Sequence, residues 1–144
     1  MKSRRIAGDI DHMQANIYSR ENMQPSLNRI LLYVKDVERA CEFYQRYFGF
    51  TSTRDNDDRI VELTPPHGGA ILMIHPAAKG VKAGQATVKL VFNVEDVEAF
   101  KTRCADAGLV FGATHRADGY SFANAKDPDG NSVSISSRGF RAGR

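Results

Sequence analysis

The side chains in this sequence best suited to coordinate a metal ion are His75, His67 and Glu62. Imidazole nitrogens and carboxylate oxygens are common ligands of zinc and related ions. A single His at the end of a strand is, however, more often a hydrogen-bonded surface group than a metal ligand. Metal coordination by these residues is therefore the alternative, and a protein without a cofactor is the expectation.

Two other patterns suggest chemistry that the surrounding residues do not complete. Residues 127–130, Asp-Pro-Asp-Gly, resemble the opening of a calcium-binding loop, but this sequence forms a turn and no Glu follows at the required distance. Cys104 has no neighbouring His that could activate it as a nucleophile. We therefore expect a structural turn, and we expect Cys41 and Cys104 to be reduced, buried thiols on helices.

Two basic residues, Arg29 and Lys89, occupy equivalent positions of an internal repeat. Residues 29–38 align with residues 89–98 without a gap, at an offset of 60, and four of the ten positions are identical. Each copy begins with an apolar stretch that favours a strand and continues into a helix pattern. The repeat predicts two copies of one structural unit, with a cation at the same place in each.

Each copy predicts a strand, a helix and three further short strands. Asp36 and Asp96 are suited to cap the helices at their N-termini, and Gly49 and Gly108 to end them in a left-handed conformation. The later strands are expected near residues 50–54, 59–64 and 70–75 in the first copy, and near residues 110–114, 120–125 and 131–136 in the second. The predicted fold class is α+β, with two βαβββ modules that form paired curved mixed sheets around a cleft and carry their helices on the outside.

The repeat also divides the chain into segments. We expect one domain over residues 26–137, with module one at residues 26–76 and module two at residues 86–137. The Lys-, Ala- and Gly-containing stretch between the modules is typical of a linker. Residues 1–25 are expected to be a loosely ordered N-terminal arm, and residues 138–144 a basic C-terminal tail.

The distribution of charge argues against nucleic acid as a partner. The formal net charge is +3, but residues 26–137 contain 13 Lys and Arg against 14 Asp and Glu. The excess positive charge therefore lies in the flanking segments, and the domain lacks the basic and aromatic stripe of a nucleic-acid-binding surface. No run approaches the ~18 apolar residues of a membrane span, and the basic N-terminal residues lack the apolar stretch of a secretory signal. We expect a cytoplasmic protein without a membrane role.

Three motifs resemble those of the vicinal oxygen chelate superfamily. They are LNRILLYVKD at residues 27–36, CEFY with FGF within residues 41–50, and KDPDGN at residues 126–131. This superfamily includes glyoxalase I, extradiol dioxygenases, fosfomycin-resistance transferases and bleomycin-binding proteins. The resemblance covers residues 27–137 and implies the paired βαβββ fold, whereas the function stays open because one fold hosts many chemistries.

The resemblance also implies where a metal ion would be held. Metal-dependent members use His or Glu from the first and last strand of each module, and the corresponding residues of this sequence are Arg29, Met73, Lys89 and Ser134. Arg and Lys are cationic donors, Met is a soft ligand, and a neutral Ser hydroxyl is a weak one. We therefore assign no metal site and no catalytic residue, and whether the protein is an enzyme stays open.

The predicted cleft is lined by residues that alternate along the strands, on the sheet faces opposite the helices. Arg29 and Lys89 would converge there on an anionic or oxygen-rich small molecule, against an apolar wall. In the alternative interpretation, both cations pair internally with Glu62 or other acidic residues, and no ligand binds. The predicted ligand-binding residues are Arg29, Leu31, Tyr33, Met73, His75, Lys89, Val91, Asn93 and Ser134.

Three classes of function follow from these features. The first is metal-independent small-molecule binding of a resistance or detoxification type, although the two cations disfavour bleomycin, which is itself cationic. The second is a divergent glyoxalase-like lyase or dioxygenase-like enzyme, with Tyr33 or His75 as acid or base. The third is a non-catalytic dimeric association module. We expect a homodimer, because dimers cover exposed strands and complete clefts.

Overall fold

The structure is a computed structural model that describes residues 26–142 as two consecutive modules. The first module contains β1 (Arg29–Val34), α2 (Val37–Phe48), β2 (Thr51–Thr53), β3 (Val61–Thr64) and β4 (Ile71–Pro76). The second contains β5 (Lys89–Asn93), α3 (Val97–Asp106), β6 (His115–Ala117), β7 (Tyr120–Lys126) and β8 (Ser132–Ser136), and is followed by the 3-10 helix η1 (Arg138–Phe140). The expected N-terminal arm lies outside the described residues. Within residues 26–142, no helix has both the length and the apolar character needed to cross a membrane.

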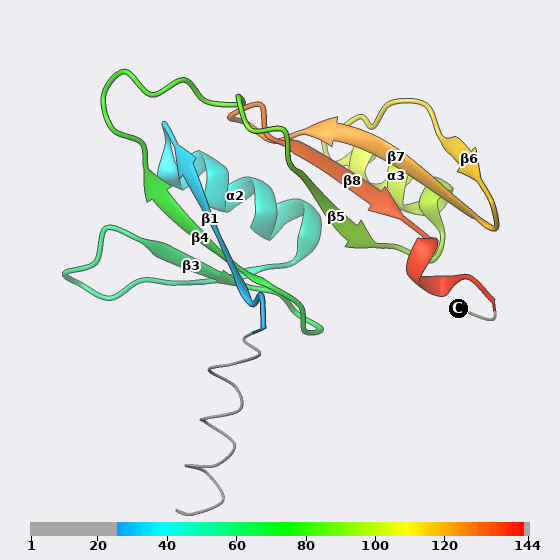
Figure 1. Cartoon of the computed structure of the whole chain (residues 1–144), viewed down its shortest axis with the longest axis horizontal. Coiled ribbons are helices and arrows are strands. Elements are labelled where there is room, and N and C mark those ends of the chain that lie inside the picture. The colour runs from blue at the N-terminus through cyan, green and yellow to red at the C-terminus, as the bar shows by residue number, and fades with distance from the viewer. Residues whose placement is uncertain (1–25, 143–144) are drawn as a thin grey trace, which may run out of the picture.

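Each module forms one four-stranded mixed sheet. The strand orders are β1-β4-β3-β2 and β5-β8-β7-β6. The first and last strands of each module pair in parallel, and the remaining pairs are antiparallel. In Figure 1 the two sheets lie side by side, and α2 and α3 both lie behind the strands of their own sheet. The predicted α+β fold of two βαβββ modules is confirmed.

The two helices begin at the predicted residues but end differently. The side chains of Asp36 and Asp96 each accept a hydrogen bond from the backbone N–H three residues later, which satisfies a free donor of the first turn. Gly49 ends α2 in the left-handed conformation, with φ of 73°. The C-cap of α3 is instead Ala107 in a right-handed conformation, and Gly108 follows with φ of 108°. Gly108 thus takes the left-handed backbone conformation predicted for the end of α3, one residue after the C-cap, and the N–H groups of Gly108 and Leu109 donate to the last-turn oxygens of Ala105 and Cys104.

One predicted strand is wrong. The pattern of residues 110–114 favours a strand, but the edge strand β6 begins only at His115. The physical reason lies at Phe111, whose side chain is buried in the core of the second module. The neighbouring Gly112 N–H donates to the backbone oxygen of Asn124. Burial of the Phe111 ring therefore fixes residues 110–114 outside the sheet, and pairing with β7 starts only at His115.

The modules meet where the end of α2 packs against β5 and α3. The rings of Phe48 and Phe92 are stacked, with centroids 3.8 Å apart, and Phe48 also lies 6.0 Å from Phe100. The Tyr47 hydroxyl donates to the backbone oxygen of Ala107 at 3.0 Å. These contacts join the modules on the helix side of the sheets and leave the opposite side of both sheets uncovered by a helix.

Both cysteines are buried free thiols on helices, as the sequence predicts. Burial raises the pKa of the Cys41 thiol, with a further increase from Glu38 and an opposing effect of Arg54. Burial also raises the pKa of Cys104, against the effect of the adjacent Arg103. A raised pKa keeps a thiol protonated and therefore unreactive, which agrees with a structural role for both residues.

Candidate ligand-binding faces of the two sheets

Each sheet has one face covered by its helix and one that is not, which we call its open face. The residues of β1 that pack into the core are Ile30, Leu32 and Val34. Because successive side chains of a strand point to opposite faces, Arg29, Leu31 and Tyr33 belong to the open face. This is the face that the sequence assigned to ligand binding.

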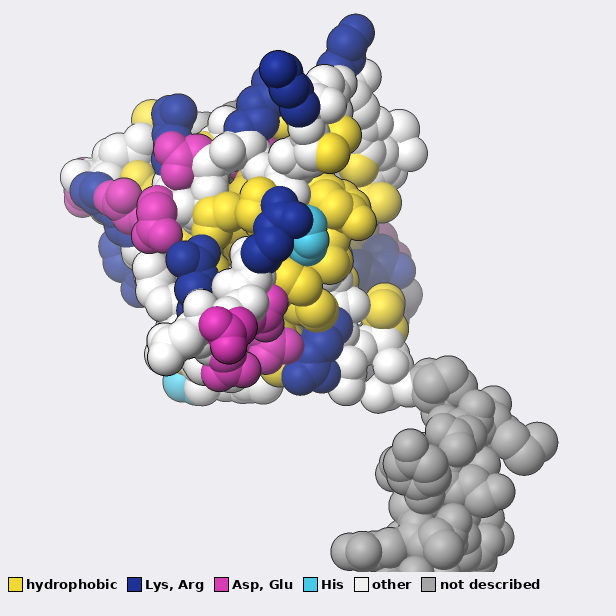
Figure 2. Space-filling model, turned by 90° about the vertical axis from the view of Figure 1, so that its left-hand side faces the viewer, with side chains coloured by type: hydrophobic (Ala, Val, Ile, Leu, Met, Phe, Trp, Pro, Cys, Tyr) yellow, Lys and Arg dark blue, Asp and Glu magenta, His cyan; other side chains and the backbone are white. Residues whose placement is uncertain are grey.

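The open face of the first module has an apolar and aromatic centre. Tyr33 is 57% exposed, and Met73 and His75 on the adjacent β4 are partly exposed. Tyr33 and His75 are paired across β1 and β4, and their ring centroids are 5.3 Å apart. On the side of the molecule that lies to the left in Figure 1, hydrophobic side chains gather near the centre of the surface, and basic, acidic and histidine side chains lie on and around them (Figure 2). On the open face, Tyr33 and Met73 can supply an apolar wall for a ligand.

The imidazole of His75 has one nitrogen already engaged. Its Nδ1 lies 2.7 Å from the backbone oxygen of Pro76. Because a carbonyl oxygen only accepts hydrogen bonds, this contact assigns the proton of the neutral ring to Nδ1. The Nε2 atom is then the unprotonated nitrogen, which can accept a proton or a hydrogen bond.

The open face of the second module combines cations with aromatic rings. Lys89 and Val91 on β5 are exposed, Val91 by 60%. The Lys89 Nζ lies 6.0 Å from the ring centroid of Phe122. Phe122 stacks on His115 and Tyr120, with centroid distances of 5.1 and 6.2 Å. This surface presents partly exposed aromatic rings and a cation to a flat apolar molecule.

The segment after β8 adds two basic residues to this face. The guanidinium groups of Arg138 and Arg141 lie 5.2 and 5.3 Å from the ring centroid of Tyr120. Arg138 Nη1 also donates to the Tyr120 hydroxyl at 2.9 Å. Arg138 and Arg141 belong to the predicted basic tail, and both pack against Tyr120 of β7.

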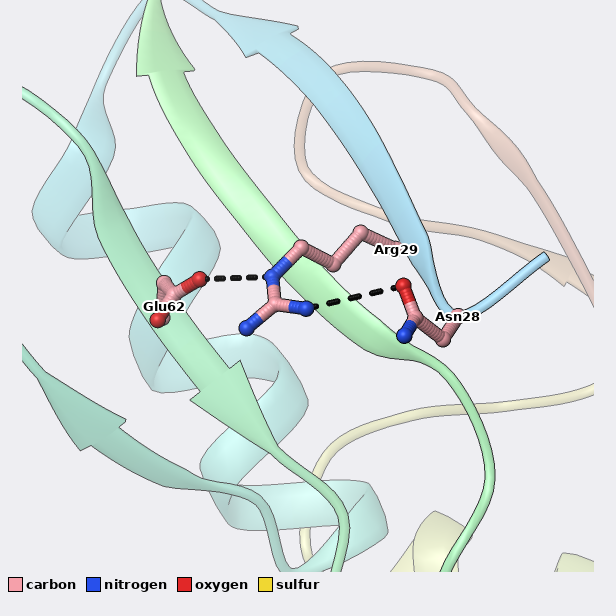
Figure 3. A network of polar contacts seen from close by, with 3 residues as sticks. All are labelled: Asn28, Arg29 and Glu62. Atoms are coloured by element: carbon pink, nitrogen blue, oxygen red, sulfur yellow. Dashed lines mark hydrogen bonds and ion pairs between the residues drawn. The ribbon is translucent and has the colours of Figure 1, made fainter. Parts of the chain in front are cut away.

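Arg29 and Lys89 make corresponding contacts in the two modules. Arg29 Nε donates to Glu62 Oε1 on β3 at 2.9 Å, and its Nη1 reaches Asn28 Oδ1 at 3.5 Å (Figure 3). Lys89 Nζ donates to Asn124 Oδ1 on β7 at 3.0 Å. In each module, the cation of the first strand therefore reaches across to a side chain of the third strand.

The two partners, Glu62 and Asn124, also occupy equivalent positions. Glu62 lies opposite Met73 in the β3–β4 pairing, and Asn124 lies opposite Ser134 in the β7–β8 pairing. A carboxylate neutralises a cation, whereas an amide oxygen carries no net charge. Within residues 26–142, Lys89 forms no ion pair. The first module thus compensates its cation internally, and the second leaves its cation positive.

The four positions that correspond to metal ligands do not fit a divalent ion. Two of them are the cations Arg29 and Lys89 themselves. Ser134 is buried and donates its hydroxyl to the backbone oxygen of Ala123 at 3.0 Å. Met73 offers a thioether, which is a soft ligand. Elsewhere in the described part of the chain, no group of three or more His, Cys, Asp and Glu is placed to hold a metal.

The structure places the predicted site residues in two groups. Arg29 lies on β1 of the first sheet and Lys89 on β5 of the second. Both open faces are turned to the same side of the molecule, because both helices lie behind the sheets (Figure 1). The convergence of the two cations on one ligand therefore stays a prediction. The first group is Arg29, Leu31, Tyr33, Met73 and His75, and the second is Lys89, Val91, Asn93 and the buried Ser134.

Sequence reasoning missed several residues of the second open face. Phe122 and Asn124 alternate with the core residues Ala123 and Ala125 along β7, and this alternation could have placed them on the open face. Arg138 had no such signal, because its place depends on how η1 folds back against β7. The aromatic and basic character of this face is therefore largely a result of the tertiary structure.

Comparison with protein families gives a match over most of the chain. The family model described as Glyoxalase/Bleomycin resistance protein/Dioxygenase superfamily matches residues 26–135. Comparison with curated proteins gives no match.

Several solved structures share this architecture. TnmS3, an antibiotic binding protein from Streptomyces sp. CB03234, has a TM-score of 0.65 and 22% identity, over 76% of this chain and 93% of that chain. Lactoylglutathione lyase from Agrobacterium tumefaciens has a TM-score of 0.61 and 21% identity, over 78% and 92% of the two chains. A superfamily member from Sphaerobacter thermophilus DSM 20745 has a TM-score of 0.64 and 21% identity, over 77% and 95%. At these identities, the likeness shows a common fold.

Proposed function

The chain belongs to the Glyoxalase/Bleomycin resistance protein/Dioxygenase superfamily, and on that premise we propose that it is a metal-independent small-molecule-binding protein of the resistance or detoxification type. The proposed ligand is anionic or oxygen-rich, has an apolar body, and binds on the open faces of the sheets. The observation that carries this proposal is the uncompensated positive charge of Lys89 on a face that also presents Val91 and the ring of Phe122.

The surroundings of Lys89 support an anionic ligand with a flat apolar part. An ammonium beside apolar groups gains more from an anion than one in open water, because the site excludes solvent when the ligand binds. Among the described residues, the hydrogen-bond partner of Lys89 is the Asn124 amide oxygen, which an incoming anion can replace or supplement. The stacked rings of Phe122 and His115 offer a surface for the ligand body.

The first module supports the proposal in a different way. Its Arg29–Glu62 pair is partly exposed, with side-chain exposures of 45% and 37%. Exposed ion pairs contribute only about 0–1 kcal/mol, so a ligand anion can compete for the guanidinium. Met73, which lies opposite Glu62 in the β3–β4 pairing, and Tyr33, further along the same face of β1, provide apolar area. We therefore assign Arg29 a secondary role and Lys89 the primary one.

A second copy of the chain would complete the site. The two open faces are turned to the same side, so a ligand enclosed between two such faces needs a partner subunit (Figure 1). Two-fold association can place the first module of one protomer over the second module of the other. This supports the proposed homodimer and explains how Arg29 and Lys89 could act on one ligand from different protomers.

The solved relatives support binding and catalysis about equally. TnmS3 is described as an antibiotic binding protein, and the protein from Agrobacterium tumefaciens as a lyase. We place this chain with the binding proteins because its metal-ligand positions hold the wrong donors. One observation favours a lyase-like enzyme as the second candidate. The free Nε2 of His75, next to the Tyr33 ring, could act as a base without a metal.

A ligand screen on four proteins tests the proposed function. Small aromatic carboxylates and their uncharged amides are screened by thermal shift on the native protein and on Lys89→Met, Arg29→Met and Lys82→Met, and the affinities of hits are then measured by calorimetry. We expect Lys89→Met to weaken carboxylate binding by about tenfold or more, since a charge-assisted hydrogen bond is lost. Arg29→Met should cost less affinity. Lys82→Met, which removes the same charge from the exposed linker, should have no effect.

Two outcomes would contradict the proposal. If carboxylates and amides bind all four proteins equally, the anion site on the open faces does not exist. If bound hits are converted into products, and if this conversion is lost in His75→Gln but kept in Lys82→Met, the chain is an enzyme of the second kind.

A further inference from the structure

A cavity of about 630 Å³ lies at the junction of the two modules, on the helix side of the sheets. It is formed by the end of α2, the loop after β3, the end of β5, and α3. Its size falls within the range of about 300–1,000 Å³ that is usual for small-molecule sites. Neither Arg29 nor Lys89 lines it. Of the predicted ligand-binding residues only Asn93 does, together with His67, which the sequence analysis considered as a metal ligand. Apart from Asn93, the cavity is thus separate from the candidate site on the open faces.

The walls of this cavity are largely aromatic. Phe48, Phe92 and Phe100 line it and are each partly exposed. Phe48 is nearly parallel to both other rings, at interplanar angles of 15° to Phe92 and 24° to Phe100. Partly exposed rings in such an arrangement offer area onto which a flat apolar molecule can stack.

Two guanidinium groups stand at the same cavity. Arg46 comes from the last turn of α2, and Arg103 from the last turn of α3. Each lies over an aromatic ring of its own helix, Arg46 at 5.7 Å from the centroid of Tyr47 and Arg103 at 4.7 Å from that of Phe100. In the described part of the chain, neither forms an ion pair, and no Asp or Glu lines the cavity.

A basic residue in the last turn of a helix also has a simpler explanation. It offsets the negative end of the helix dipole, which stabilises a helix by about 0.3–1 kcal/mol. This effect explains why each helix carries an arginine near its end. It does not explain why both arginines line one aromatic cavity that contains no carboxylate. That combination is the arrangement expected for recognition of an anionic group attached to an apolar body.

We propose that the junction cavity is a second ligand site, which binds a small molecule with a flat aromatic body and one carboxylate or sulfonate group. The body stacks against Phe48, Phe92 and Phe100, and the anion accepts hydrogen bonds from Arg46 and Arg103. Because the cavity is lined by residues of both modules, an occupied site also joins the modules more firmly. The proposal does not depend on the site at Lys89.

A pair of fluorescent probes tests the charge requirement. The anionic probe is 8-anilinonaphthalene-1-sulfonate, and the uncharged analogue is N-phenyl-1-naphthylamine. We expect the Arg46→Gln/Arg103→Gln double variant to bind the sulfonate about tenfold more weakly and to bind the uncharged analogue with about unchanged affinity. Arg39→Gln, on the first turn of α2 and outside the cavity lining, is the matched control and should behave as the native protein.

Amide chemical shifts locate the bound sulfonate. Binding in the cavity should shift the amide signals of Gly49, Val94 and Ala107, which line it. Shifts confined to Val91 and Phe122 would place the probe on the open face and would overturn the proposal. Sulfonate affinity that is equal in the native protein and the double variant would overturn it as well. Both arginines are exposed, so the double variant should keep its fold, which its unfolding midpoint verifies.

Discussion

The hydroxyl of Tyr44 donates a hydrogen bond of 2.7 Å to Oδ2 of Asp127, and this contact joins α2 of the first module to the turn between β7 and β8 of the second. Asp127 is only 5% exposed. Its carboxylate also accepts hydrogen bonds from the backbone of Asp129 and from the backbone and side chain of Asn131. The turn that resembles a calcium loop therefore uses its carboxylate to hold the two modules together.

Removal of this hydroxyl should destabilise the protein. A hydrogen bond to a charged group contributes about 1.5–3 kcal/mol, so we expect Tyr44→Phe to lower the free energy of unfolding by roughly that amount. Urea denaturation measures the change. Tyr47→Phe is the matched control, because its hydroxyl donates to an uncharged backbone oxygen and contributes only about 0.5–1.5 kcal/mol. If Tyr44→Phe lowers the free energy of unfolding by less than Tyr47→Phe does, the role assigned to Asp127 is contradicted.

The same contact predicts loss of stability in alkali. Burial, together with the adjacent Asp127 carboxylate, raises the pKa of Tyr44 far above its ordinary value of 10.0. The folded state therefore retains the proton while the unfolded state releases it. The contribution of protonated Tyr44 to the free energy of unfolding is fully present below pH 10.0 and decreases as the pH rises above that value. We expect the unfolding midpoint to fall over this range, and to fall less steeply in Tyr44→Phe. An equal slope in both proteins would refute this account.

The different partners of the two cations predict opposite effects of two near-isosteric changes. Asn124→Asp should neutralise Lys89 and weaken binding of an anionic ligand on the open face, by about tenfold. Glu62→Gln should release Arg29 from its ion pair and strengthen anion binding. Calorimetric titration with one carboxylate hit measures both. If the two variants change affinity in the same direction, the charge balance of the modules does not govern binding.

The donor set at the ligand positions predicts that the protein retains no transition metal. After expression in medium supplemented with zinc, manganese, iron and nickel, elemental analysis should find far less than one ion per chain. A chelator-treated portion of the same preparation sets the baseline. One firmly held ion per chain, lost together with Arg29→Ala or Met73→Ala, would show that these positions bind metal after all.

The uncovered sheet faces predict a homodimer. Light scattering should give a mass of twice 16.0 kDa at micromolar concentration. Val91→Asp places a charge on the open face of the second module and should shift the protein toward a monomer. Val110→Asp is the control, because Val110 is 76% exposed and lies in the loop after α3. A native protein that is monomeric at this concentration would exclude the proposed dimer.

The sequence alone was sufficient to predict the fold because its main signal is local and occurs twice. The alternation of apolar residues, Asp36 and Asp96 at the helix starts, and Gly49 at a helix end each depend on a few neighbouring residues. Where a long-range contact overrode the local pattern, the prediction failed. Residues 110–114 have the composition of a strand, but burial of the Phe111 ring takes them away from the sheet ladder.

The sequence also placed Arg29, Tyr33, Lys89 and Val91 on the sheet faces opposite the helices, since strand alternation depends only on residue parity. It could not decide which cation stays uncompensated. That depends on the register of β3 and β7, which brings Glu62 to Arg29 but Asn124 to Lys89. The junction cavity also required the tertiary structure, because Arg46 and Arg103 are 57 residues apart and meet there only when α2 and α3 pack at the module boundary. Periodicity thus determined which residues face outward, and the packing of distant segments decided which of them keep a free charge.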